Sequence, residues 1–126
     1  MNVILYSGAD PSPWLVLNKT LISRGFLIEV ARDGLEGVRK ARALQPDLIL
    51  MDLFLARMDS LDVINQLKGC ALTWDIPTIF MSTWPPDYSR WLARETGAQG
   101  VLAKPFGGEE ILGIIRKYMP RRAGHL

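Results

Sequence analysis

Three side chains with complementary chemistry each stand at the end of a short apolar run: Asp52 after residues 48–51, Ser82 after 78–81 and Lys104 after 100–103. A carboxylate that faces an ammonium group and a hydroxyl group suits the transfer of a phosphoryl group to the carboxylate. Asp52 would be the nucleophile, Lys104 would offset charge on the phosphoryl oxygens, and Ser82 would donate a hydrogen bond to one of them. A metal ion is the component that these three residues do not supply.

The apolar runs belong to a repeated pattern in which short apolar segments alternate with longer segments of helical period. This pattern predicts strands over 3–6, 27–30, 48–51, 78–81 and 100–103, and helices over 13–24, 35–43, 60–67, 87–95 and 109–119. The first helix is expected to begin with Ser12 as its N-cap and Pro13 at its first position, and to stop at Gly25.

Strands that are apolar on both faces and joined by helical crossovers predict an α/β fold with a doubly wound, five-stranded parallel sheet and helices on both faces. We predict the strand order 2-1-3-4-5. The 126 residues fit one domain over 1–126. In such a sheet the carboxyl ends of the strands share one edge, which would bring Asp52, Ser82 and Lys104 together.

Composition excludes several classes of protein. The net charge is only +2 and the charged residues are interspersed, so direct nucleic-acid binding is not expected. The apolar runs are too short to span a membrane and residues 1–3 lack the basic start of a signal peptide, so we expect a cytoplasmic protein without a membrane partner. The single cysteine, Cys70, can form neither an internal disulfide nor a zinc finger.

Over nearly its whole length the sequence resembles the receiver domain of two-component response regulators, a flavodoxin-like (βα)5 fold. The resemblance rests on several motifs at matching spacings. They are the run 46–53 with its phosphoacceptor position, the run 58–63, Gly25-Phe26, Asp33-Gly34, Ile76-Pro77, Gly97-Ala98 and Lys104-Pro105-Phe106.

The resemblance implies a signalling domain of a phosphorelay rather than an enzyme. Asp52 would be the aspartate that is phosphorylated from a histidine kinase or phosphotransfer protein, Ser82 would contact the phosphoryl group, and Lys104 would be the family's lysine. Mg²⁺ would be the cofactor, bound by Asp52 and by the main-chain carbonyl of Phe54.

The sequence departs from the family at the metal site. Receivers usually carry two adjacent acids after the first strand, and here that place is taken by Ser7-Gly8 or by Gly8-Ala9. Mg²⁺ favours carboxylate oxygens, so we expect it to bind weakly or not at all. Asp10 is the nearest substitute, and it could reach the site only if the turn over 9–11 folds back.

Other departures concern the signal. The aromatic residue that usually reports on the site from the fifth strand is Val101, and Trp84 could cover the pocket. Tyr88 and Trp91 lie on the predicted fourth helix, which together with the fifth strand and fifth helix forms the face through which receivers dimerise or dock partners. An output domain or effector protein, or a second copy of the chain, is therefore expected there.

One alternative function stays open. The chain could be an atypical pseudo-receiver that keeps Asp52 and Lys104 as a structural ion pair and signals by protein binding without phosphorylation. A phosphatase of the haloacid-dehalogenase type is excluded because it needs a second acid two residues after the nucleophile, where Phe54 stands. The chain is expected to be either a stand-alone receiver or a fragment of a longer protein.

Overall fold

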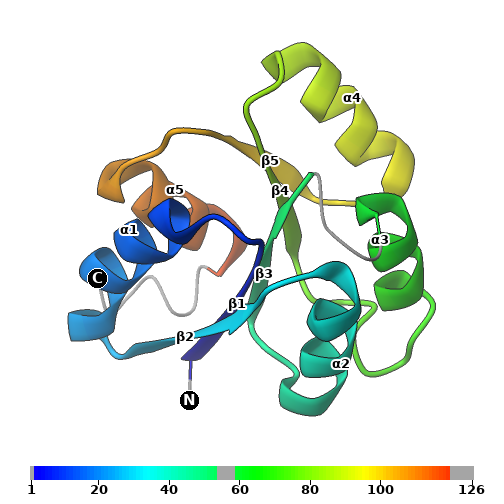
Figure 1. Ribbon diagram of the computed structural model, residues 1–126, viewed down its shortest axis with the longest axis horizontal. Coiled ribbons are helices and arrows are strands. Elements are labelled where there is room, and N and C mark those ends of the chain that lie inside the picture. Colours follow the sequence, from blue (N-terminus) through cyan, green and yellow to red (C-terminus); the bar gives the residue numbers. More distant parts are fainter. Residues whose placement is uncertain (1, 54–58, 120–126) are drawn as a thin grey trace.

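The computed structural model describes residues 2–53 and 59–119, in which strands and helices alternate along the chain (Figure 1). The strands are β1 (Asn2–Ser7), β2 (Phe26–Ala31), β3 (Leu48–Asp52), β4 (Thr78–Ser82) and β5 (Gly100–Ala103). The helices are α1 (Pro11–Leu21), α2 (Gly34–Leu44), α3 (Ser60–Lys68), α4 (Pro86–Thr96) and α5 (Gly108–Tyr118), and a 3-10 turn, η1 (Ile22–Arg24), follows α1. All strand pairs are parallel, in the order β2-β1-β3-β4-β5, so the predicted fold and topology are confirmed.

The sheet separates two hydrophobic layers because its central strands are apolar on both faces. Within β1, Ile4 and Tyr6 pack on the side of α1 and α5, whereas Leu5 packs on the side of α2, α3 and α4. Figure 1 shows this division, with α1 and α5 together on one side of the strands. The period of two along each strand thus assigns its side chains alternately to the two layers.

Helix α1 begins earlier than the sequence predicts. Its N-cap is Asp10, whose carboxylate accepts a hydrogen bond from the Ser12 N–H at 3.0 Å, and the first helical residue is Pro11. The expectation that Ser12 caps the helix and Pro13 opens it is therefore wrong, because Asp10 and Pro11 take these two roles. The expected stop is confirmed, because Gly25 adopts the left-handed conformation (φ 86°) that glycine tolerates best.

The strand register brings the predicted site residues to one edge of the sheet. Asp52 is paired with Met81, which places Ser82 one step further along the same edge. Ser82 is paired with Ala103, and the Lys104 N–H continues this ladder by donating to the Ser82 carbonyl at 2.8 Å. Asp52, Ser82 and Lys104 thus end three neighbouring strands.

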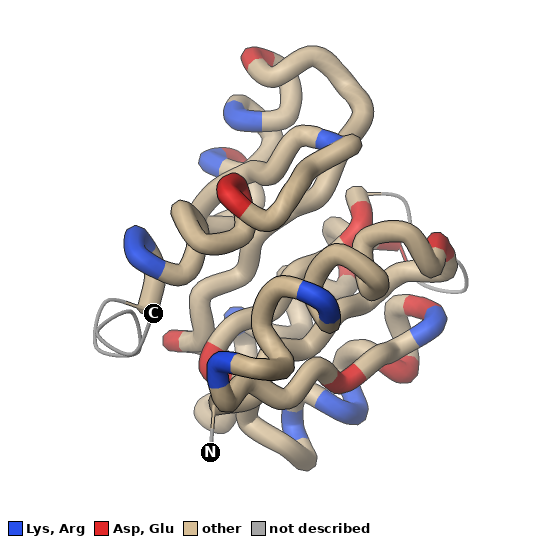
Figure 2. Tube along the Cα trace, turned by 90° about the vertical axis from the view of Figure 1, so that its left-hand side faces the viewer, with Lys and Arg blue, Asp and Glu red and all other residues tan. Residues whose placement is uncertain are grey.

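Charged residues are distributed over many elements. Figure 2 shows Lys and Arg interspersed with Asp and Glu along the described part of the chain. Between residues 2 and 119, leaving out 54–58, no helix has the length and apolar character needed to cross a bilayer.

Candidate functional site

Asp52 is the centre of the candidate site. It ends β3 and its side chain is largely buried, with 11% of its surface exposed. Burial raises the pKa of the Asp52 carboxyl, the Lys104 ammonium opposes that shift, and the negative charge of Asp10 adds to it. Burial, a raised pKa and a cationic neighbour together make Asp52 a candidate functional residue.

Lys104 supplies that cation. Its Nζ forms an ion pair with Asp52 Oδ1, and its side chain is also mostly buried, with 18% exposed. Because β4 lies between β3 and β5, the lysine side chain reaches across the end of β4 to meet the aspartate. The pairing that the sequence predicts from strand order is therefore present.

Ser82 lies between them and is held from the side of α4. Its Oγ accepts hydrogen bonds from the Trp84 N–H at 2.9 Å and from the Ser89 hydroxyl at 3.0 Å. With both acceptor positions used, the Ser82 hydroxyl proton is left to act as a donor. Ser89 was not expected from the sequence, and the signal that could have revealed it is its position on the buried face of α4, one turn before Ala93.

The segment after β1 contacts Asp52 from the other side. A Cβ atom added to Gly8 would lie 2.5 Å from Asp52 Oδ2 and 2.8 Å from the Tyr6 hydroxyl oxygen. Gly8 therefore lies in contact with the aspartate, and the phenol of Tyr6 lies beside both. The phenol is buried in the α1/α5 layer, and this burial raises its pKa, as do the charges of Asp52 and Asp10. Sequence reasoning did not identify Tyr6 because it reads as an ordinary strand aromatic.

The residues present do not fit a Mg²⁺ site of the usual carboxylate type. Over residues 2–53 and 59–119, no group of three or more acidic, histidine or cysteine side chains is placed to hold a metal. The carboxylate of Asp10 caps α1, and Ser7, Gly8 and Ala9 offer no carboxylate. Phe54, whose carbonyl was expected to be a ligand, lies outside the described residues, so that assignment stays a prediction.

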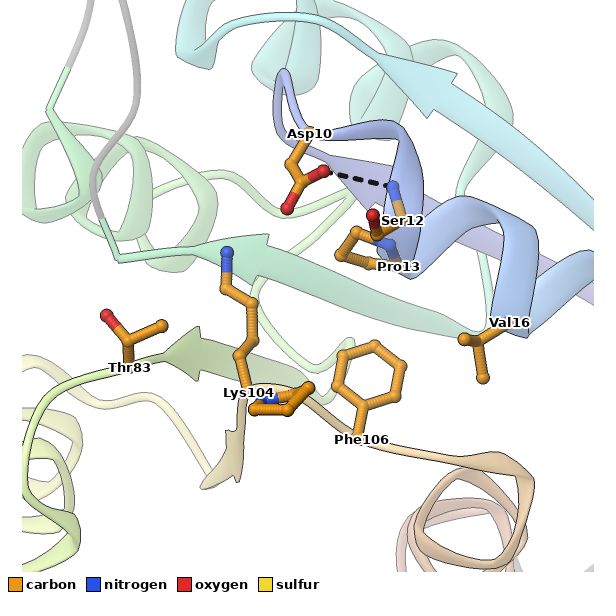
Figure 3. A pocket seen from close by; sticks show the side chains of 8 residues that line it. Asp10, Ser12, Pro13, Val16, Thr83, Lys104 and Phe106 are labelled. Atoms are coloured by element: carbon orange, nitrogen blue, oxygen red, sulfur yellow. Dashed lines mark hydrogen bonds between the residues drawn. The ribbon is translucent and has the colours of Figure 1, made fainter.

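A pocket of about 320 Å³ opens beside Lys104 (Figure 3). Asp10 and Ser12 border it from the start of α1, and Thr83 and Lys104 from the ends of β4 and β5. Its apolar wall is formed by Pro13, Val16, Pro105 and Phe106. Lys104 thus borders an open pocket on the side of α1.

An aromatic cluster lies on α4 and on the segment just before it. The ring centroids of Trp84 and Tyr88 are 4.8 Å apart, and those of Tyr88 and Trp91 are 5.9 Å apart. All three side chains are substantially exposed. Trp84 does not line the pocket beside Lys104, so its indole packs along α4 instead of covering that pocket.

Comparison with known families and proteins gives matches over most of the chain. The model of the response regulator receiver domain matches residues 10–116. The DNA-binding dual master transcriptional regulator RpaA of Synechocystis is 32% identical over 118 residues, which are 94% of this chain and 49% of RpaA. Response regulator MprA of Mycobacterium tuberculosis is 30% identical over 83% of this chain and 45% of MprA. The chain thus spans about half the length of these relatives.

Solved structures agree in fold. The receiver domain of the sensor histidine kinase PA1611 of Pseudomonas aeruginosa, described with a magnesium ion coordinated in its active-site cleft, superposes with a TM-score of 0.81 at 26% identity, covering 94% of this chain and 98% of that one. The chemotaxis response regulator CheY4 of Vibrio cholerae superposes with a TM-score of 0.85 at 24% identity, with the same coverage of both chains.

Proposed function

The chain belongs to the response regulator receiver domain family of two-component signalling, and from that membership we propose that Asp52 is the residue that accepts the phosphoryl group. The donor would be the phosphohistidine of a histidine kinase or of a phosphotransfer protein. One observation carries the proposal. Asp52 is a buried carboxylate in an ion pair with Lys104, beside the Ser82 hydroxyl, at the edge where three strands end.

The chemistry follows from these groups. A carboxylate oxygen of Asp52 attacks the phosphorus of phosphohistidine, the P–N bond breaks, and its electron pair stays on the imidazole nitrogen. The product is an acyl phosphate on Asp52. Lys104 offsets the charge on the phosphoryl oxygens, and Ser82 donates its hydroxyl proton to one of them.

We propose that the signal leaves the site through α4. Ser82 is hydrogen-bonded to Ser89 on that helix and to the main chain of Trp84. A phosphoryl group that engages the Ser82 hydroxyl changes these bonds, and α4 carries the exposed ring of Trp91. The face formed by α4, β5 and α5 would then bind an output domain, an effector protein or a second copy of the chain.

A specific observation also favours the second candidate, a pseudo-receiver that binds a partner without phosphorylation. The described residues near Asp52 do not provide the carboxylates of a Mg²⁺ site. Under this function the ion pair between Asp52 and Lys104 is structural, and the α4 face is the part that signals.

Intact-mass measurement after incubation with acetyl phosphate separates the two functions. We expect a phosphoryl adduct on the native chain and on an Asp59→Asn control, which keeps an N-cap residue at an exposed aspartate of α3. We expect no adduct on Asp52→Asn. An adduct that persists on Asp52→Asn contradicts the proposal, and no adduct on any of the three proteins supports the pseudo-receiver.

A further inference from the structure

The space that a side chain at position 8 would enter is occupied by the Asp52 carboxylate and the Tyr6 phenol. A side chain at position 8 would have to begin 2.5 Å from Asp52 Oδ2 and 2.8 Å from the Tyr6 hydroxyl, and 3.1 Å from the Tyr6 Cζ atom. Real Cβ atoms do not approach other heavy atoms closer than 3.0 Å, so the first atom of any such side chain displaces the carboxylate or the phenol. A residue larger than glycine at position 8 therefore forces the Asp52 carboxylate or the Tyr6 phenol to move.

The phenol is fixed in this place at both ends. Its ring packs in the layer between the sheet and helices α1 and α5, with 1% of the residue exposed. Its hydroxyl donates to the Asp10 carbonyl at 2.5 Å, one residue before α1 begins. Moving it would break a hydrogen bond and open a void in the core, both of which are unfavourable.

We infer that the Tyr6 phenol closes the space beside Asp52 Oδ2 that a carboxylate at position 8 and a divalent cation would share, and that the Lys104 ammonium on Oδ1 is the resident cation of the site. A metal site would therefore need two substitutions together, one at position 8 and one at Tyr6. An acidic residue at position 8 does not create a metal site while the Tyr6 hydroxyl is present, and removal of that hydroxyl does not create one while position 8 is glycine.

This inference concerns metal binding, so it can hold or fail independently of whether Asp52 is phosphorylated. It also distinguishes this chain from the PA1611 receiver domain, which is described with Mg²⁺ in its cleft. Mg²⁺ requires oxygen ligands in octahedral geometry. Here the Asp52 carboxylate has the Lys104 ammonium on one side and the Tyr6 phenol near the other, and neither supplies a carboxylate oxygen.

Calorimetric titration with MgCl₂ tests the inference on four proteins: the native chain, Tyr6→Phe, Gly8→Asp and the double variant. We expect no saturable binding to the first three. The double variant should bind Mg²⁺ saturably, at least about tenfold more tightly than any residual binding to Gly8→Asp. Saturable binding to the native chain, or equal binding to Gly8→Asp and the double variant, overturns the inference.

A metal-free measurement covers the case in which Gly8→Asp does not fold. Gly8→Ala adds only the Cβ atom, and its loss of thermal stability should be smaller in a Tyr6→Phe background, because one of the two close contacts is then gone. If the losses caused by Gly8→Ala are equal in both backgrounds, the phenol does not close this space and the inference is wrong.

Discussion

Replacement of Lys104 by methionine removes the cation beside Asp52 and retains most of the apolar stem. The side chains of this pair are 18% and 11% exposed, which lies between an exposed pair, worth about 0–1 kcal/mol, and a fully buried one, whose disruption costs about 3–5 kcal/mol. We therefore expect a loss of about 2–3 kcal/mol at neutral pH. An unfolding entropy of about 2.1 cal/mol/K per residue converts this into a fall in Tm of roughly 8–11 °C for a chain of this length.

The loss should depend on pH because it comes from an unpaired carboxylate. Without Lys104, burial and the charge of Asp10 are left to raise the pKa of Asp52, so the carboxyl takes up a proton at higher pH than in the native chain. A raised folded pKa gives stability that is complete in acid and is lost as the pH rises through that pKa. The difference between the two proteins should thus shrink near pH 4.

Urea unfolding at neutral pH and near pH 4 measures this effect, with Lys19→Met on the exposed side of α1 as the control. In an Asp52→Asn background the loss caused by Lys104→Met should fall below about 1 kcal/mol. A Lys104→Met protein as stable as the native chain at neutral pH, or an equal loss in the Asp52→Asn background, would show that the ion pair does not stabilise the fold.

Three further changes test other parts of the structure. Asp52→Asn also breaks the ion pair with Lys104, but it removes the charge whose burial costs more than the pairing with Lys104 returns, since burial outweighs Lys104 in setting the pKa of this carboxyl. The substitution should therefore raise the free energy of unfolding at neutral pH, and the gain should diminish in acid; a gain that grows as the pH falls contradicts this. Gly100→Ala should destabilise the domain by about 1–3 kcal/mol because its Cβ meets the Tyr118 hydroxyl, and thermal unfolding should show partial rescue by Tyr118→Phe. Asp59→Ala removes the N-cap of α3 and should lower stability by about 1 kcal/mol in urea unfolding, whereas Asp59→Asn should not.

The fold could be predicted because its strands are recognisable in the sequence as short apolar runs. Residues 48–51 and 78–81 are apolar at every position or nearly so, which indicates strands covered on both faces, and polar residues mark where they end. The parallel arrangement then brings Asp52 next to Ser82 without any knowledge of side-chain geometry.

The start of α1 could not be predicted in the same way. Asp10-Pro11 and Ser12-Pro13 are equally good cap–proline pairs, so local preference does not choose between them. The start at Asp10 is accompanied by a contact from outside the helix, because the Tyr6 hydroxyl of β1 donates a hydrogen bond to the Asp10 carbonyl. A contact between β1 and the residue before α1 is a tertiary interaction, which the local helix pattern does not contain.

The site shows the same division. The spacing of Asp52, Ser82 and Lys104 predicts which residues meet, since strand ends converge. It does not predict that Tyr6 fills the space over Gly8 or that Ser89 binds Ser82, because both depend on side chains that project from one element onto another.

We propose that Asp52 carries the phosphoryl group, and an acyl phosphate at this position can be located chemically. Borohydride reduces an acyl phosphate to an alcohol, so treatment of the acetyl phosphate-reacted chain, followed by peptide sequencing by mass spectrometry, converts the modified aspartate into homoserine and identifies its position. We expect homoserine at position 52 alone. Homoserine at Asp10 or at any other aspartate, with Asp52 unchanged, would contradict it.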